Sequence, residues 1–262
     1  MTINIYYSYL GETYNLPEPV NLQKKYMSPS APDFMTNKDM GMPYRCPAMR
    51  GFYKNMFGIP ALYDYDVEVR DGKIYSNDKS EEFFKAAIHV RNAEMRGLSL
   101  NLSQVVLLPD ADSLGLTQYP PFLETTLAHA NYFPGSFDIG NFPRVLDLAL
   151  RFLSDCTWKI RKGDILHYIK FDTEEKIKFI PFAMSHKMAS LMGEIPARKT
   201  SSNLVKTDGQ FMPSGIQPEE GEVTEHSFDN VWRKVRPLSW YYGLFNKSKI
   251  KKQMLIEAKR NT

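Results

Sequence analysis

The stretch RKGDILHYIKF, from Arg161 to Phe171, decides the expected fold of this chain. Arg161 to Asp164 form a basic, turn-favouring segment, because Gly163 supplies turn dihedrals and Asp164 bonds to nearby backbone groups. The residues that follow alternate between large apolar and polar side chains, which indicates a strand with one buried face. We therefore predict a structural turn at Gly163 and Asp164 that feeds a core strand, as in many antiparallel sandwiches and barrels.

Strand patterns also lie on both sides of this stretch. Ile3 to Leu10 is rich in β-branched and aromatic residues, and the string from Ile59 to Val69 ends in strict alternation. A turn of Arg70, Asp71, Gly72 and Lys73 then predicts a β-hairpin. Glu81 to Met95 is the best helix candidate of the first half. Val145 to Leu153 is apolar throughout, so periodicity alone leaves strand and short helix open.

The composition agrees with a mainly β protein. Aromatic residues make up 13% of the chain, and 17 prolines favour strands, turns and extended connections over long helices. We expect a mainly β (α+β) fold, an antiparallel sandwich or barrel with a jelly roll as one form of it. A few short helices and an extended C-terminal arm complete this expectation.

Two parts are expected along the chain. Residues 1–183 carry nearly all strand patterns and form a β-rich body, with a proline-rich N-terminal wrap that runs to about Pro47. Residues 184–262 are predicted to form a polar linker and a basic, aromatic C-terminal arm. Within the arm, Ile250 to Arg260 is a candidate short helix.

The arm holds the one constellation typical of an interaction site. It combines cationic and ring-bearing side chains that suit a protein groove or nucleic acid. These candidate partner-binding residues are Trp232, Arg233, Lys234, Arg236, Trp240, Tyr241 and Tyr242. Because the net charge of the whole chain is only +3, docking onto protein is preferred to nucleic acid.

No catalytic motif stands out. None of the five histidines has a carboxylate two residues after it, as many cupin-like metal sites require, so ordinary packed histidines are preferred. Cys46 and Cys156 are expected to be buried free thiols. A nucleophile elbow and a phosphate-binding glycine loop are both missing from the sequence. No catalytic, cofactor or metal residue is assigned, and an enzyme is unsupported rather than excluded.

The N-terminal sequence lacks the pattern of a signal peptide, and no segment approaches a membrane span. These observations favour a reducing cytoplasm and argue against a membrane partner.

Four short motifs resemble a group of uncharacterised tailed-phage proteins, common in T4-like cyanophages and marine phages and related to a bacterial domain of unknown function. The motifs are Arg45-Cys46-Pro47-Ala48, the stretch from Ile59-Pro60 to Val69, the stretch from Phe137-Asp138-Ile139-Gly140 to Val145, and Arg161 to Phe171. The resemblance covers residues 1–183, and the third motif departs from the family pattern at Pro143 and Val145. It implies a phage origin and a compact β-rich fold, and it carries over no catalytic residue.

The leading functional expectation is a phage structural or accessory protein that makes protein–protein contacts with other virion proteins or with itself. It would lie in the host cytoplasm during infection and then in the virion. Two alternatives stay open. One is a metal-dependent oxygenase on a double-stranded β-helix scaffold, and the other is a host-interaction protein made during infection.

Overall fold

The computed structural model describes residues 1–9, 16–27, 46–71, 73–76, 87–92, 97–100, 103–124, 129–141, 145–188, 205–207, 210–212 and 249–262. It divides into two compact units, Met1–Met184 together with Thr262, and Ser185–Asn261. Each unit is described separately below.

The first unit is mainly β, with several antiparallel sheets and few short helices, and its arrangement is sandwich-like. Two of its sheets face each other and form what we call the first sandwich. One is a four-stranded sheet of β12 (Val145–Leu146), β8 (Val105–Pro109), β1 (Thr2–Tyr9) and β16 (Lys176–Pro181). The other is a five-stranded sheet of β11 (Gly135–Asp138), β9 (Gly115–Tyr119), β15 (Ile165–Asp172), β3 (Met56–Pro60) and β2 (Val20–Asn21).

Inward-facing side chains of both sheets build the core of the first sandwich. Alternate residues of β1, such as Ile5 and Tyr9, meet Phe57 of β3 and Ile169 of β15 in one apolar cluster. This packing follows from the two-residue period of strands, which directs every second side chain to the same face. The predicted core strand after Gly163 is therefore confirmed as β15, in the middle of the five-stranded sheet.

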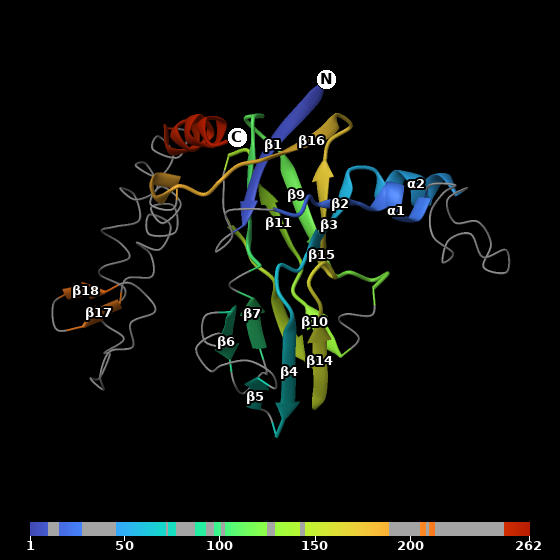
Figure 1. The fold of residues 1–262 in the computed structure, drawn as a ribbon, viewed down its shortest axis with the longest axis vertical. Helices are drawn as coiled ribbons and strands as arrows, with labels where there is room; N and C mark the ends of the chain where they lie inside the picture. Colours follow the sequence, from blue (N-terminus) through green and yellow to red (C-terminus); the bar gives the residue numbers. More distant parts are fainter. Residues whose placement is uncertain are drawn as a thin grey trace. The chain divides into compact units, whose positions relative to one another are not determined.

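A second sandwich lies beside the first (Figure 1). Its sheets are β14 (Cys156–Ile160) with β4 (Tyr65–Arg70) and β5 (Lys73–Ser76), and β10 (Ala130–Tyr132) with β13 (Ala149–Phe152), β7 (Gly97–Leu100) and β6 (Ile88–Asn92). Val67, Trp158 and Phe152 are among the residues that fill its core. The predicted hairpin is confirmed, because β4 and β5 pair in register around Asp71.

Strand β15 joins the two sandwiches. Its pairing with β3 shifts register between Ile165 and His167, as a β-bulge does, and Leu166 packs into the core of the second sandwich. Ile169, further along the same strand, packs into the core of the first. One strand thus contributes to both cores, through Leu166 at the bulge and Ile169 beyond it.

Two short helices cover part of the outer face of the five-stranded sheet, α1 (Leu22–Met27) and α2 (Pro47–Tyr53). Leu22 and Tyr53 pack there against Tyr168 of β15. Pro47 occupies the first turn of α2, where its missing N–H costs no hydrogen bond. The predicted wrap therefore contains helices in its described part, and residues 10–15 and 28–45 lie outside the described residues.

The helix predicted from Glu81 to Met95 is wrong over its middle. Residues 88–92 form β6, which pairs antiparallel with β7. Ile88 is buried in the core of the second sandwich, so cross-strand pairing and packing override the local helix preference. Residues 81–86 and 93–96 lie outside the described residues. The open choice at Val145 to Leu153 resolves to two short strands, β12 and β13.

In the second unit, β17 (Val205–Thr207) pairs antiparallel with β18 (Gln210–Met212). Residues 249–260 are helical, which confirms the predicted C-terminal helix. The Ser185 hydroxyl donates to the Glu257 carboxylate at 2.9 Å. Within the described part of the chain, no helix has the length and apolar character needed to cross a membrane.

Candidate functional site: an aromatic platform and a polar groove

The outer face of the five-stranded sheet carries a cluster of five rings that we call the aromatic platform. Its members are Phe52, Tyr53, Tyr119, Phe122 and Tyr168. Phe52 lies at the centre, with ring centroids 5.4 Å from Tyr53, 5.9 Å from Tyr119 and 6.0 Å from Phe122. Tyr53 and Tyr168 are buried, whereas Phe122 is 48% exposed. The platform thus presents an apolar ring to solvent on a packed base.

Phe122 is held in place by its neighbours rather than by a regular element. It follows Pro120 and Pro121, and its backbone N–H donates to the Pro120 carbonyl at 2.9 Å. The next backbone N–H, of Leu123, donates to the Tyr168 hydroxyl at 3.3 Å. Prolines restrict the backbone before the ring, so Phe122 loses little further freedom when it is covered.

Glu124 fastens the same corner to α1. Its carboxylate accepts a hydrogen bond from the Tyr26 hydroxyl and pairs with the Lys25 ammonium at 2.8 Å. Burial raises the pKa of Tyr26, and the hydrogen bond to Glu124 adds to this shift. Tyr26 therefore stays protonated and keeps donating at physiological pH.

A polar groove of about 600 Å³ lies beside the platform, over strands β11, β9 and β15. Strand register arranges its lining in two rows. Ser136, Thr117 and Lys170 occupy paired positions across the three strands, and the Thr117 and Ser136 hydroxyls are 3.0 Å apart. Tyr119, a member of the platform, lines the groove as well.

The second row consists of Asp138, Gly115 and Asp172, again at paired positions. Gly115 has no side chain, and a Cβ added there would lie 3.1 Å from the Cβ of Asp172. The lack of a side chain at Gly115 therefore leaves open space in the groove between the carboxylates of Asp138 and Asp172.

The two carboxylates of the second row differ in their surroundings. Asp138 accepts hydrogen bonds from the backbone N–H groups of Leu114 and Asn141, and from the side chains of Ser113 and Asn141. Although its partial burial would raise the pKa, these four hydrogen bonds lower the pKa of Asp138 to about 2. Its oxygens are engaged within the fold, whereas Asp172 is exposed.

Lys170 connects groove and platform. Its ammonium lies 4.8 Å from the centre of the Phe52 ring, which is a cation–π distance. The cation is therefore positioned at the border of the groove rather than extended into solvent.

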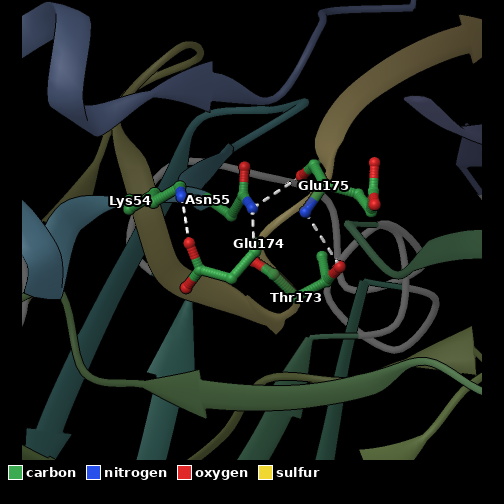
Figure 2. A network of polar contacts seen from close by, with 5 residues as sticks. All are labelled: Lys54, Asn55, Thr173, Glu174 and Glu175. Atoms are coloured by element: carbon green, nitrogen blue, oxygen red, sulfur yellow. Dashed lines mark hydrogen bonds and ion pairs between the residues drawn. The ribbon is translucent and has the colours of Figure 1, made fainter. Parts of the chain in front are cut away.

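A third polar cluster lies at the turn that connects β15 to β16, two strands of different sheets (Figure 2). The Asn55 side-chain amide donates to the carbonyls of Thr173 at 2.7 Å and Glu175 at 2.8 Å, and Lys54 pairs with Glu174. Asn55 has a φ of 52°, a left-handed conformation that asparagine tolerates better than most residues. Because the Asn55 side-chain amide already donates to two turn carbonyls, we interpret this cluster as structural.

The predicted turn residues lie between β14 and β15. Gly163 has a φ of 93°, and its N–H donates to the Ala61 carbonyl at 2.9 Å. The Asp164 carboxylate accepts from the Arg161 N–H at 2.8 Å, and the Asp164 carbonyl accepts from the Ala61 N–H. Both residues thus take part in the local hydrogen bonding of a turn, away from the groove.

The predicted partner-binding residues of the arm, Trp232, Arg233, Lys234, Arg236, Trp240, Tyr241 and Tyr242, lie outside the described residues. Their role stays a prediction.

His167 is buried where the two sandwiches meet. Its ring stacks on Tyr132 with centroids 6.1 Å apart, and no described residue lies within hydrogen-bonding reach of either ring nitrogen. Burial lowers the pKa of His167 to about 3, so the ring is neutral at pH 7.

Metal-ligating side chains do not gather in threes anywhere in the described ranges. Both cysteines are thiols outside any disulfide, as expected, but the prediction that they are buried is wrong. Cys46 is exposed just before α2, and Cys156 is partly exposed at the start of β14.

Sequence reasoning missed the groove and the platform. Thr117 and Lys170 are polar residues of strands β9 and β15, and these polar positions were the available signal. Their proximity depends on the pairing of β9 with β15, which a single sequence does not reveal.

The sequence was compared with models of protein families, and none matched. A comparison with curated proteins also found no match.

Proposed function

We propose that this protein is a phage structural or accessory protein, associated with the virion, and that its body contacts other virion proteins or a second copy of itself through the aromatic platform. The phage assignment rests on the resemblance of the four motifs. The contact surface rests on one observation, the half-exposed Phe122 ring packed on a base of four further rings.

The physical reasoning starts from the exposed ring. Aromatic side chains carry a large share of binding energy at protein interfaces, because they bury much apolar area and lose few rotatable bonds. A ring that is already fixed by a Pro-Pro corner loses even less entropy on binding. Phe122 satisfies both conditions.

The motifs of the resemblance map onto residues that shape the body rather than onto exposed chemistry. Asp138 bonds the loop that contains Ser113 and Leu114, and Gly140 packs so closely that an added Cβ would lie 2.5 Å from the Ser113 Cα. Pro47 opens α2, next to the platform. The resemblance therefore supports a shared scaffold, and the proposed role in assembly rests on the aromatic platform.

Purified phage particles provide the first test. Quantitative mass spectrometry of virions should find the protein at a fixed ratio to known structural subunits. Absence from particles would overturn the virion assignment, and recovery of a host protein in a pull-down would then favour the host-interaction alternative.

A matched pair of variants tests the platform. Phe122→Ser should reduce incorporation into particles or self-association, measured by mass spectrometry and analytical ultracentrifugation. Phe133→Ser is the control, since Phe133 is 51% exposed but has no place in the platform. Equal effects of the two substitutions, or none, would remove the platform from the proposal.

A further inference from the structure

The polar groove offers a different chemistry from the platform beside it. Its first row presents the hydroxyls of Ser136 and Thr117 and the ammonium of Lys170. Its second row presents the exposed carboxylate of Asp172. Hydroxyls both donate and accept hydrogen bonds, an ammonium only donates and a carboxylate only accepts. The floor of the groove therefore matches a ligand with many groups that can both donate and accept hydrogen bonds.

Spacing within the groove is set by the sheet. Adjacent strands lie about 4.8 Å apart, so successive side chains of the Ser136–Thr117–Lys170 row can address neighbouring groups of a small ring. At one end the partly buried Tyr119 supplies an aromatic ring with a polar tip. Gly115 leaves room for a ligand to reach the floor itself.

Charge argues against an anionic ligand. Asp138 and Asp172 outweigh the single cation Lys170 in the lining, whereas sites for phosphate or nucleic acid are built from clustered positive charge. Asp138 is already saturated by hydrogen bonds within the fold, which leaves the Lys170 ammonium as a donor and the Asp172 carboxylate as an acceptor.

An extended peptide is also a poor fit. Strand β9 pairs with β11 on one side and β15 on the other, and β15 pairs with β9 and β3. The backbone of the central floor is thus occupied by the sheet's own ladder, so the groove offers side chains and no strand edge above β9 and β15.

We propose that this groove binds a neutral carbohydrate, with Thr117, Ser136, Lys170 and Asp172 bonding sugar hydroxyls and Tyr119 contacting the apolar face of a sugar ring. Open grooves with hydrogen-bonding floors and an aromatic side suit such ligands, because sugars combine hydroxyls with apolar C–H faces. This inference goes beyond the proposed assembly role and does not depend on it.

A glycan microarray that carries neutral, sialylated and sulfated oligosaccharides, probed with the full-length protein, is the first experiment. Binding should concentrate on neutral glycans. Isothermal titration calorimetry with the strongest neutral oligosaccharide then measures the affinity of the variants.

Gly115→Ala should lower the affinity at least tenfold, because its methyl group raises the floor against Asp172. Thr117→Val and Lys170→Met should each lower it as well, since they remove hydrogen-bonding groups and keep the size of the side chain. Lys178→Met is the matched control, since Lys178 is an exposed lysine of β16 outside the groove lining. Thermal melts identify any variant that fails to fold. If Gly115→Ala fails to fold, the glycan affinity of Thr117→Val tests the groove instead.

Three results would overturn the proposal. These are no binding to neutral glycans, binding confined to sulfated or sialylated glycans, and neutral-glycan affinity that the groove variants leave unchanged. Phe122→Ser should keep glycan binding, so the proposal for the groove and the proposal for the platform are tested separately.

Discussion

A φ of 93° at Gly163 places this residue in a region of backbone space that side chains with a Cβ rarely adopt. No atom lies within 4 Å of an added Cβ, so any penalty for substitution comes from the backbone and not from a clash. We expect Gly163→Val to lower the free energy of unfolding by about 1–3 kcal/mol. Thermal or urea unfolding of the purified variant measures this change.

Gly51 is the matched control for Gly163. It lies in α2 with equally open space around it, and its φ is outside the left-handed region. Alanine favours helix over glycine by about 1 kcal/mol, so Gly51→Ala should leave stability unchanged or raise it. An unchanged melting temperature for Gly163→Val would show that the turn tolerates a side chain.

The buried His167 ring predicts a pH dependence of stability. Its pKa is about 3 in the folded protein, against 6.5 for an ordinary histidine, so the unfolded chain takes up a proton first as the pH falls. The folded state therefore keeps its full stability above pH 6.5. It loses up to about 1.4 kcal/mol per pH unit from this group as the pH falls from 6.5 towards 3.

Urea unfolding at pH 7, 6, 5 and 4 tests this dependence, with His167→Leu as the reference. Carboxylates also titrate in this range, and the leucine variant retains them. The wild type should lose more stability than the variant between pH 6.5 and 4. Parallel curves for the two proteins would contradict a neutral, buried His167.

At the scale of elements, the turn that connects β15 to β16 depends on a side chain that belongs to neither strand. Asn55→Ala removes both hydrogen bonds to the carbonyls of Thr173 and Glu175 (Figure 2). We expect a loss of about 1–3 kcal/mol in the free energy of unfolding, because two turn carbonyls lose their donor and alanine adapts less well to the left-handed backbone.

Lys54→Ala serves as the comparison, since it removes the neighbouring pair with Glu174. That pair is exposed, and exposed ion pairs contribute little to stability. Urea denaturation of the two variants should therefore rank Asn55→Ala well below Lys54→Ala in stability. A reversed order would show that the ion pair, and not the amide, stabilises the turn between β15 and β16.

Local patterns predicted those elements whose neighbours in space are also neighbours in sequence. The β4–β5 hairpin around Asp71 and the turn-to-strand unit of β15 follow from turn residues and alternation alone. The segment from Glu81 to Met95 shows the opposite case, since β6 exists through its pairing with β7 and its packing in the second sandwich.

The candidate site was beyond local patterns for the same physical reason. Ser136, Thr117 and Lys170 come from three strands, and only their register brings them into one row. Phe122 follows Pro120 and Pro121 in the sequence, but the other rings of the platform come from α2, β9 and β15. Such long-range partners are fixed by tertiary packing, which a single sequence does not display.

At the scale of the molecule, the first unit should fold without the second. The three apolar clusters formed by described residues of the body draw all their buried residues from positions up to Phe179. A chain that ends at Met184 is therefore expected to be soluble, with a β-type circular dichroism spectrum and a cooperative thermal transition. Aggregation, or a transition without cooperativity, would show that residues 185–262 complete the core.

In the four-stranded sheet of the first sandwich, β1 pairs in parallel with β16, from Thr2 opposite Lys176 to Tyr7 opposite Pro181. A force applied at Met1 and Met184 pulls these two strands from opposite ends, so their hydrogen bonds are loaded together in shear. By contrast, β1 and β8 are antiparallel, and a force at Met1 and Asp110 acts near one end of their ladder and opens the bonds one after another.

Single-molecule force spectroscopy with handles at these two pairs of positions should give a higher rupture force for Met1 and Met184 than for Met1 and Asp110. Equal forces would contradict a shear clamp at β1 and β16. The parallel pairing thus makes the body mechanically anisotropic. It resists a force between Met1 and Met184 more strongly than a force between Met1 and Asp110.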